Sequence, residues 1–148
     1  MFRRLACAAL IAGLALPAVA NEGAIKARQG QFQMFALNLG VLGGMAQGRV
    51  AYDADAAQEA ADNLFHLTRN TQLGMWPQGS DNMATDGTRA LPLIWDQNED
   101  FLARYAALQA AAEGMQAAAG TDLATLQGAL GGLGGACQAC HQQFRAEQ

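Results

Sequence analysis

The chain is predicted to be all-α, with four helices packed as an antiparallel up-down-up-down bundle. Alanine and leucine are abundant and β-branched residues are scarce, which favours helix over strand. Apolar residues recur at helical spacing in four stretches, separated by two short connections and one long one. About 128 residues remain once a predicted N-terminal leader is set aside, which suits a single domain.

The first twenty residues are typical of a cleaved signal peptide. Residues 1–4 contain two arginines, the apolar run that follows ends at Pro17, and an A-x-A cleavage site follows at residues 18–20. The run is too short to cross a bilayer, which takes roughly 20 residues. We therefore expect residues 1–20 to be removed on export to the periplasm, leaving one domain over residues 21–148.

The first two helices are predicted from apolar spacing and capping signals. The first covers about residues 22–48. The second begins at Asp53 or Asp55, where Gln58 completes a capping-box-like pattern with Asp55, and it ends near Leu73. The first helix carries one apolar stripe at helical spacing, made of Ile25, Phe32, Phe35, Ala36, Leu39 and Leu42.

The longest predicted loop covers residues 74–88, because it is rich in glycine, asparagine, aspartate and proline. Pro92 suits the first turn of a third helix. Gly120 marks the end of that helix, and Thr121 or Asp122 can cap the fourth.

The fourth helix contains the sequence Cys137-Gln-Ala-Cys140-His141, a C-x-x-C-H attachment motif for c-type haem. The two thiols form thioethers with the porphyrin, and the imidazole of His141 becomes the axial ligand of the iron. A redox dithiol would need a βαβ context, and a zinc site would need a second ligand pair. Only Cys7 and His66 remain for such a pair. The motif therefore predicts one covalently bound haem c.

Composition excludes several classes of partner. The formal charge is −4 for the whole chain and −6 without the predicted leader, since two of the nine basic residues leave with it. There is no basic cluster, which argues against nucleic acid and against an anionic membrane surface as partners. No segment after the leader is long and apolar enough to be transmembrane.

Further short sequences, in their order and spacing, resemble the cytochrome c′ family, whose members form up-down-up-down four-helix bundles. The resemblance extends over essentially all of residues 21–148, and it includes a haem motif in the last helix. The matching pieces are Ile25-Lys26-Ala27-Arg28-Gln29, Tyr52-Asp53-Ala54, Met75-Trp76-Pro77 with Gly79-Ser80, Thr88-Arg89-Ala90 with Pro92, Ile94 and Trp95, and Cys140-His141-Gln142-Gln143-Phe144-Arg145.

The resemblance implies roles around the haem. Arg28 and Gln29 are expected near the propionates, and Thr88 and Arg89 at the haem edge; on pattern alone, Arg28 and Gln29 could equally be a solvated helix face. Arg145, four residues after His141, is expected on the same side of the helix and influences the imidazole. It could also act simply as a cation at a helix C-terminus.

The resemblance also implies an iron with five ligands, the sixth position being covered by Phe32. By periodicity alone Phe32 is an ordinary core residue. Met34 lies about 200° further around the helix and Met45 is three turns away, so neither is placed to bind the iron. A phenyl ring has no lone pair for iron, so we expect a vacant, apolar distal site.

These features imply a protein that binds nitric oxide or carbon monoxide, takes part in electron transport with a periplasmic redox partner, or does both. Bound dioxygen is disfavoured because it requires a hydrogen-bond donor. The alternative is a low-spin, six-coordinate electron-transfer cytochrome of the same fold. A peroxidase is a weaker alternative, because the distal site has no base and no cation to promote O–O cleavage. We expect a protein that is not an enzyme and that forms homodimers, as the family commonly does.

Overall fold

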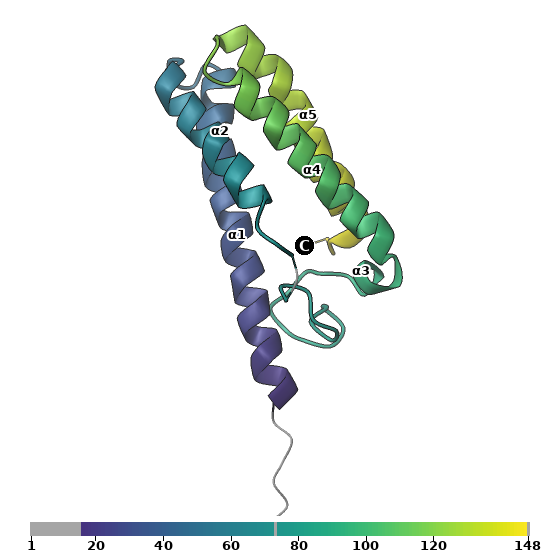
Figure 1. Cartoon of the computed structure of the whole chain (residues 1–148). Coiled ribbons are helices and arrows are strands. Elements are labelled where there is room, and N and C mark those ends of the chain that lie inside the picture. Colours follow the sequence, from purple (N-terminus) through teal and green to yellow (C-terminus); the bar gives the residue numbers. More distant parts are fainter. Residues whose placement is uncertain (1–15, 73, 148) are drawn as a thin grey trace, which may run out of the picture.

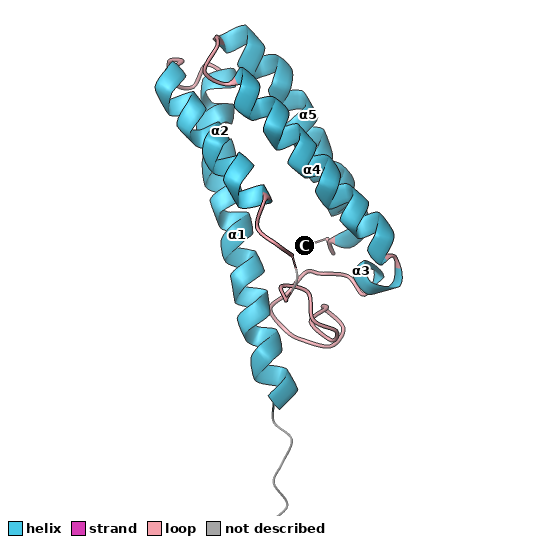
Figure 2. Cartoon of the chain, viewed as in Figure 1, coloured by secondary structure: helices cyan, strands magenta, loops and turns pink. Residues whose placement is uncertain are grey.

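The computed structural model describes residues 16–72 and 74–147, with the side chains of residues 16–20 excepted. Four long helices and one short helix make up this part of the chain, and it contains no strand. The prediction of an all-α bundle is confirmed (Figures 1 and 2). The helices are α1 (Leu16–Ala46), α2 (Ala54–Thr68), α3 (Leu93–Asp96), α4 (Asn98–Ala118) and α5 (Leu123–Phe144).

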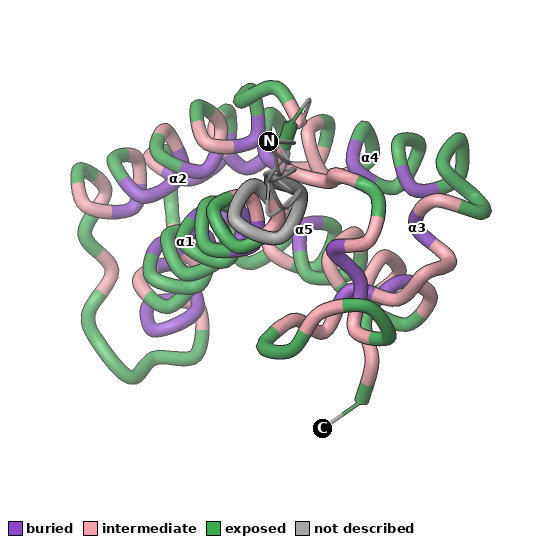
Figure 3. The backbone as a smooth tube through the Cα atoms, turned by 90° about the horizontal axis from the view of Figure 1, so that it is seen from below, coloured by how far each residue is buried: buried purple, intermediate pink, exposed green. Residues whose placement is uncertain are grey.

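The long helices pack in a closed order, α1 on α2, α2 on α4, α4 on α5 and α5 on α1. Figure 3 shows that their buried positions lie on the sides that face neighbouring helices. Twelve buried residues form the main core, of which Leu42, Met115, Leu126 and Leu133 are the largest fully buried ones. A second, smaller cluster lies beside α3, at the opposite end of the bundle, and contains Ala90, Ile94, Phe101 and Phe144.

Two aspartates start helices as predicted. The carboxylate of Asp53 accepts a hydrogen bond from the backbone N–H of Ala56 at 2.9 Å, and Asp122 accepts one from Thr125 at 2.8 Å. Such caps satisfy donors that have no partner within the helix. The predicted capping box at Gln58 is wrong, because its side chain instead contacts Asp62, the carbonyl of Gln116 and the N–H of Gly120.

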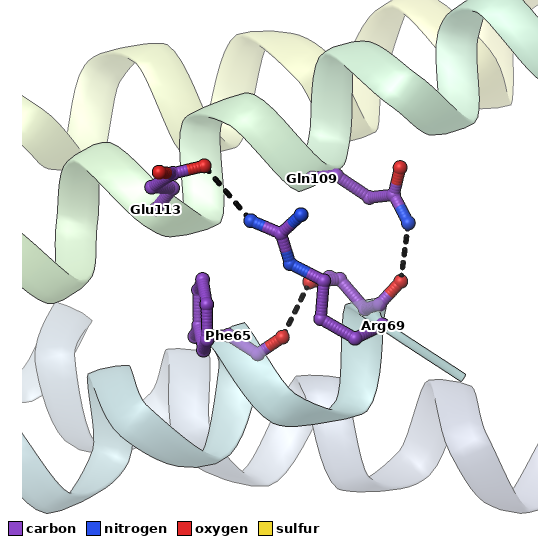
Figure 4. Close-up of polar contacts among 5 residues, drawn as sticks. Phe65, Arg69, Gln109 and Glu113 are labelled. Atoms are coloured by element: carbon purple, nitrogen blue, oxygen red, sulfur yellow. Dashed lines mark hydrogen bonds and ion pairs between the residues drawn. The ribbon is translucent and has the colours of Figure 1, made fainter.

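The second helix ends at Thr68, earlier than the predicted Leu73. Its end is fixed against α4, as Figure 4 shows: Arg69 pairs with Glu113 at 2.8 Å, and Gln109 donates to the carbonyl of Thr68. The guanidinium of Arg69 also lies 4.5 Å from the centre of the Phe65 ring. These contacts use the last carbonyls of α2, so the chain leaves the helix here.

The third predicted helix is interrupted. Gln97 has φ −121° and ψ 49°, outside the helical region, and this residue separates α3 from α4. Gln97 caps the short helix by donating its N–H to the carbonyl of Leu93. The break turns α3 and Ile94 toward the second cluster.

The N-terminal helix begins at Leu16, before the predicted Glu22. Pro17 lies in its first turn, where the missing N–H is not needed. Residues 1–15 of the predicted leader lie outside the described residues, and cleavage after Ala20 stays a prediction. Within the described part, no helix is both long and apolar enough to cross a membrane.

Candidate haem site

A cleft of about 680 Å³ opens beside the second cluster, lined by residues of α1, α4, α5 and the segment between α2 and α4. This volume lies in the range of cofactor sites. The structure brings all nine residues singled out in the sequence to this one cleft, namely Arg28, Gln29, Phe32, Thr88, Arg89, Cys137, Cys140, His141 and Arg145.

The last two turns of α5 supply the chemistry of the C-x-x-C-H motif. Cys137, Cys140 and His141 are three and four residues apart, which places them on one side of the helix. Both thiols are free and half-buried, and burial raises the pKa of each. Two thiols and an imidazole along one wall of a largely apolar cleft fit a covalently attached haem.

The surroundings of the His141 imidazole favour its neutral form over its charged form. Burial lowers its pKa, and the charges of Arg145 and Arg89 lower it further. Only the neutral ring can donate a nitrogen lone pair to a metal. The surroundings of His141 therefore suit a metal ligand.

Phe32 faces His141 from the opposite wall. The two ring centres are 6.4 Å apart in an edge-to-face arrangement. Phe32 also packs edge-to-face on Phe35 at 5.7 Å and on Trp76 at 6.5 Å. With 38% of its surface exposed, Phe32 belongs to the cleft wall rather than to the core.

Among the described residues, no methionine or lysine lines the cleft, and His141 is the only histidine that does. Met34 is 45% exposed on α1, whereas Met45 is 5% exposed and belongs to the main core. Neither methionine considered as a sixth ligand of the iron therefore lies in the cleft.

Arg28 is almost fully buried, at 2% exposure, and joins α1 to the loop after α2. Its guanidinium donates to the carbonyl of Met75 at 3.1 Å, to the hydroxyl of Ser80 at 2.8 Å, to the Ser80 carbonyl, and to the hydroxyl of Thr88 at 2.8 Å. It also lies 4.5 Å from the centre of the Trp76 ring. Burial lowers the pKa of Arg28 to about 10, an effect that Asp81 partly opposes.

The remaining predicted residues tie the loop to the helices. Gln29 donates to the carbonyl of Gly87 at 2.7 Å. Arg89 donates to the carbonyl of Ala146 through Nε at 2.8 Å and through Nη2. The same segments pair through their backbones, as Ala146 donates to Arg89 and an isolated bridge joins Ala90 to Arg145.

Arg145 differs from its expected geometry. It is the C-cap of α5, and its backbone is extended, at φ −121° and ψ 126°, so Arg145 is not a helical residue as expected. Its N–H still donates to the carbonyl of His141 at 3.2 Å. Its charge reaches His141 from beyond the helix, which combines the two roles considered for it.

Trp76, Phe101, Arg104 and Tyr105 also line the cleft, and none of them was predicted as a site residue, although Trp76 is part of the family resemblance. The last three of these four belong to α4 and share a face with Leu108, by their spacing of three and four residues. Arg104 could have been recognised in the sequence as a cation on an otherwise apolar helix face. Trp76 lies in an irregular loop, where no periodicity indicates direction.

Comparison with known proteins places these features in a family. The model of a family described as Cytochrome C′ matches residues 23–145. The chain is 42% identical to cytochrome c-554 of Cereibacter sphaeroides over 137 residues, covering 89% of this chain and 90% of that protein. It is 35% identical to cytochrome c′ of the same organism over 148 residues, covering 99% of each.

Solved structures agree. Cytochrome c′ from Rhodobacter Spheriodes superposes with a TM-score of 0.84 at 34% identity, covering 86% of this chain and 98% of that chain. Variants of cytochrome c prime from Alcaligenes xylosoxidans, one as a nitric oxide complex and one with carbon monoxide bound, each give a TM-score of 0.75 at 28% identity. Each covers 86% of this chain and 97% of that chain.

Proposed function

The chain belongs to the cytochrome c′ family, and from this membership we propose that its haem iron has five ligands and binds nitric oxide or carbon monoxide on the open side. As in the family, haem c is bound covalently, through Cys137 and Cys140. Members of the family are haem carriers, so the chain is not an enzyme. His141 is the axial ligand in this proposal.

The observation that carries the proposal is the pair Phe32 and His141 on opposite walls of the cleft, 6.4 Å between ring centres. A haem supplies an iron that can take a diatomic gas where the protein provides no second ligand. Phe32 offers no lone pair, and none of the methionines and lysines in the described part of the chain lines the cleft. The relatives that bind nitric oxide and carbon monoxide support the same chemistry.

The apolar wall favours some gases over others. Dioxygen gains a partial negative charge on binding and is stabilised by a hydrogen-bond donor, which the ring of Phe32 does not provide. Nitric oxide and carbon monoxide depend less on such a donor. Phe32 must move for any ligand to enter, so it limits the rate of binding.

The optical spectrum of the purified holoprotein tests the proposal. We expect a broad, high-spin ferrous band that sharpens and shifts when carbon monoxide is added. Narrow, split visible bands that do not respond to carbon monoxide would mean a sixth protein ligand and would support the low-spin alternative. Replacement of Met34 and of Met45 by leucine would then identify the ligand.

A second experiment tests His141. His141→Ala should keep the haem covalently attached, which a haem stain of a denaturing gel reports, because both cysteines remain. The ferric and ferrous spectra should change, because the axial bond is lost. Spectra identical to those of the parent protein would contradict the assignment, and His66→Ala is the matched control.

Export belongs to the same proposal. A periplasmic location suits the leader predicted in residues 1–20, because c-type haem is attached after translocation of an unfolded chain. Mass spectrometry of the protein purified from its host should find a chain that begins at Asn21 and carries one haem. A mass that includes the leader would contradict cleavage.

We also propose a homodimer formed through α1. Beyond the haem cleft, Ala36, Leu37, Gly40, Val41 and Gly44 line a shallow, mainly apolar depression. Leu37 is 62% exposed there. The small residues allow a second helix to approach closely. Sedimentation should show a dimer that Leu37→Glu dissociates, whereas a parent protein that is monomeric at high concentration would contradict it.

A further inference from the structure

Four arginines converge on the haem cleft, against the charge of the whole chain. The sequence has 13 acidic and 9 basic residues and a formal charge of −4. Of the described residues that line the cleft, none is an aspartate or glutamate, and the four charged ones are Arg28, Arg89, Arg104 and Arg145. The cleft is therefore a positively charged region of an acidic protein.

These charges are not paired within the protein. In the described part of the chain, the two ion pairs are Lys26 with Glu22 and Arg69 with Glu113, and neither involves a cleft arginine.

The carboxylates nearest in sequence are equally unpaired with the cleft. Asp86 lies three residues before Arg89, Asp100 lies one turn before Arg104, and Glu147 lies two residues after Arg145. No ion pair joins these carboxylates to the cleft arginines in the part of the chain described here. Without a carboxylate beside it, a cation is screened by solvent and salt alone.

The hydrogen bonds of the arginines are made to neutral groups. Arg89 donates to the Ala146 carbonyl, and Arg104 makes only a long contact of 3.5 Å with the side-chain oxygen of Gln143.

Exposure increases from the floor of the cleft to its edge. Arg28 is buried, Arg89 is half-buried, and Arg104 and Arg145 are exposed. A haem brings two propionate carboxylates, which leaves two of the four arginine charges uncompensated. The excess positive charge is therefore exposed to solvent at the edge of the cleft.

We propose that Arg89, Arg104 and Arg145, the arginine rim, form the docking surface for an acidic redox protein, which exchanges one electron with the haem. The proposal rests on haem occupying this cleft. Charged groups around an interface steer a partner of opposite sign and set its orientation. Carboxylates on the partner pair with the rim. One electron passes between the partner's redox centre and the haem, and no bond is made or broken.

Electrode surfaces of known charge can stand in for the partner. The holoprotein is adsorbed on gold coated with a carboxylate-terminated or an amine-terminated monolayer, at pH 7 and low ionic strength, and cyclic voltammetry measures the haem signal. Net charge alone predicts a signal on the amine surface. The arginine rim predicts the larger signal on the carboxylate surface, lost as salt reduces the Debye length below about 10 Å. A larger signal on the amine surface would overturn the proposal.

Variants localise the effect. Arg104→Gln should lower the signal on the carboxylate surface by at least about twofold, since a rim charge acts on encounter. Arg104→Lys keeps the charge and should retain the signal. Arg49→Gln removes an exposed arginine near the turn after α1, outside the cleft, and is the matched control. An equal loss in Arg49→Gln, or none in Arg104→Gln, would overturn the docking surface.

The optical spectrum and its change with carbon monoxide, recorded for each variant, report on the haem independently. A normal carbon monoxide response with no preference for the carboxylate surface means that docking fails while the proposed gas binding stands. No carbon monoxide response together with a preference for the carboxylate surface means that the proposed gas binding fails while the docking surface stands.

Discussion

Phe32 and His141 come from the first and last helices of the chain, yet their rings meet edge-to-face across one cleft, 6.4 Å apart. Neither residue indicates the other in sequence. Their positions follow from the packing of α1 against α5, and they define where a flat cofactor would lie. The predictions below follow from this pair and from the contacts that hold it.

Phe32→Ala should speed carbon monoxide binding to the ferrous protein. Removal of the ring lowers the steric barrier, and an increase on the order of tenfold corresponds to about 1.4 kcal/mol. Stopped-flow mixing measures the rate, and Met34→Ala on the exposed side of the same helix is the control. Unchanged kinetics in Phe32→Ala would mean that this ring does not cover the iron.

Trp76→Ala should also speed binding, by less than Phe32→Ala. Trp76 supports Phe32 at 6.5 Å and is itself held by Phe101 at 4.8 Å and by the charge of Arg28. Without the indole, Phe32 moves aside more easily. Trp76→Phe keeps a ring at this position and should have the smaller effect. A rate in Trp76→Ala equal to that of the parent would show that Phe32 needs no support from the loop.

Arg28→Met should destabilise the protein by about 2–3 kcal/mol, because buried oxygens lose their donors. Ser80 is fully buried and would be left with an unsatisfied carbonyl. Arg28→Lys should recover only part of the loss, since an ammonium cannot reproduce the planar fork. Urea unfolding followed by circular dichroism measures the change. Complete recovery in Arg28→Lys would show that charge rather than geometry matters.

Asp122 should make stability depend on acid. Hydrogen bonds from the backbone and side chain of Thr125 lower the pKa of Asp122 below its usual 3.8. The unfolded state then binds more protons below pH 3.8, so this stabilisation is complete above that value and is lost as the pH falls through the folded pKa. Asp122→Asn keeps a cap that cannot ionise. Between pH 5 and pH 2.5 the melting temperature should fall less in Asp122→Asn than in the parent protein. The same dependence of melting temperature on pH in both proteins would contradict the prediction.

Local signals account for what could be predicted. Helix starts at Asp53 and Asp122 depend on one side chain and its own backbone, and the C-x-x-C-H spacing fixes one face of α5. The helix break at Gln97 could not be predicted, because no glycine or proline stands there and the break depends on the tertiary packing of α3. Only the family resemblance indicated that Phe32 covers the sixth position of the iron, because periodicity alone assigns Phe32 to the hydrophobic core.

Long-range contacts account for what was missed. Arg28 finds its acceptors in a loop about fifty residues away, and nothing near Arg28 in sequence indicates them. Trp76 and Arg104 join the cleft only because the loop and α4 fold against α1 and α5. Arg145 leaves the helix because its backbone bridges to Ala90, a partner that helical periodicity cannot anticipate.

The half-buried thiols of Cys137 and Cys140 have a consequence for the order of maturation. Burial raises the pKa of both, so folding disfavours their thiolate forms relative to the unfolded chain. Covalent attachment is thus favoured while the last helix is still unfolded and its thiols are solvated. The backbone pairing of residues 89–91 with residues 144–146 then joins the end of the last helix to the loop before α3. The cofactor would be enclosed during folding rather than inserted afterwards, and the finished protein would keep it even when a gas displaces the surrounding side chains.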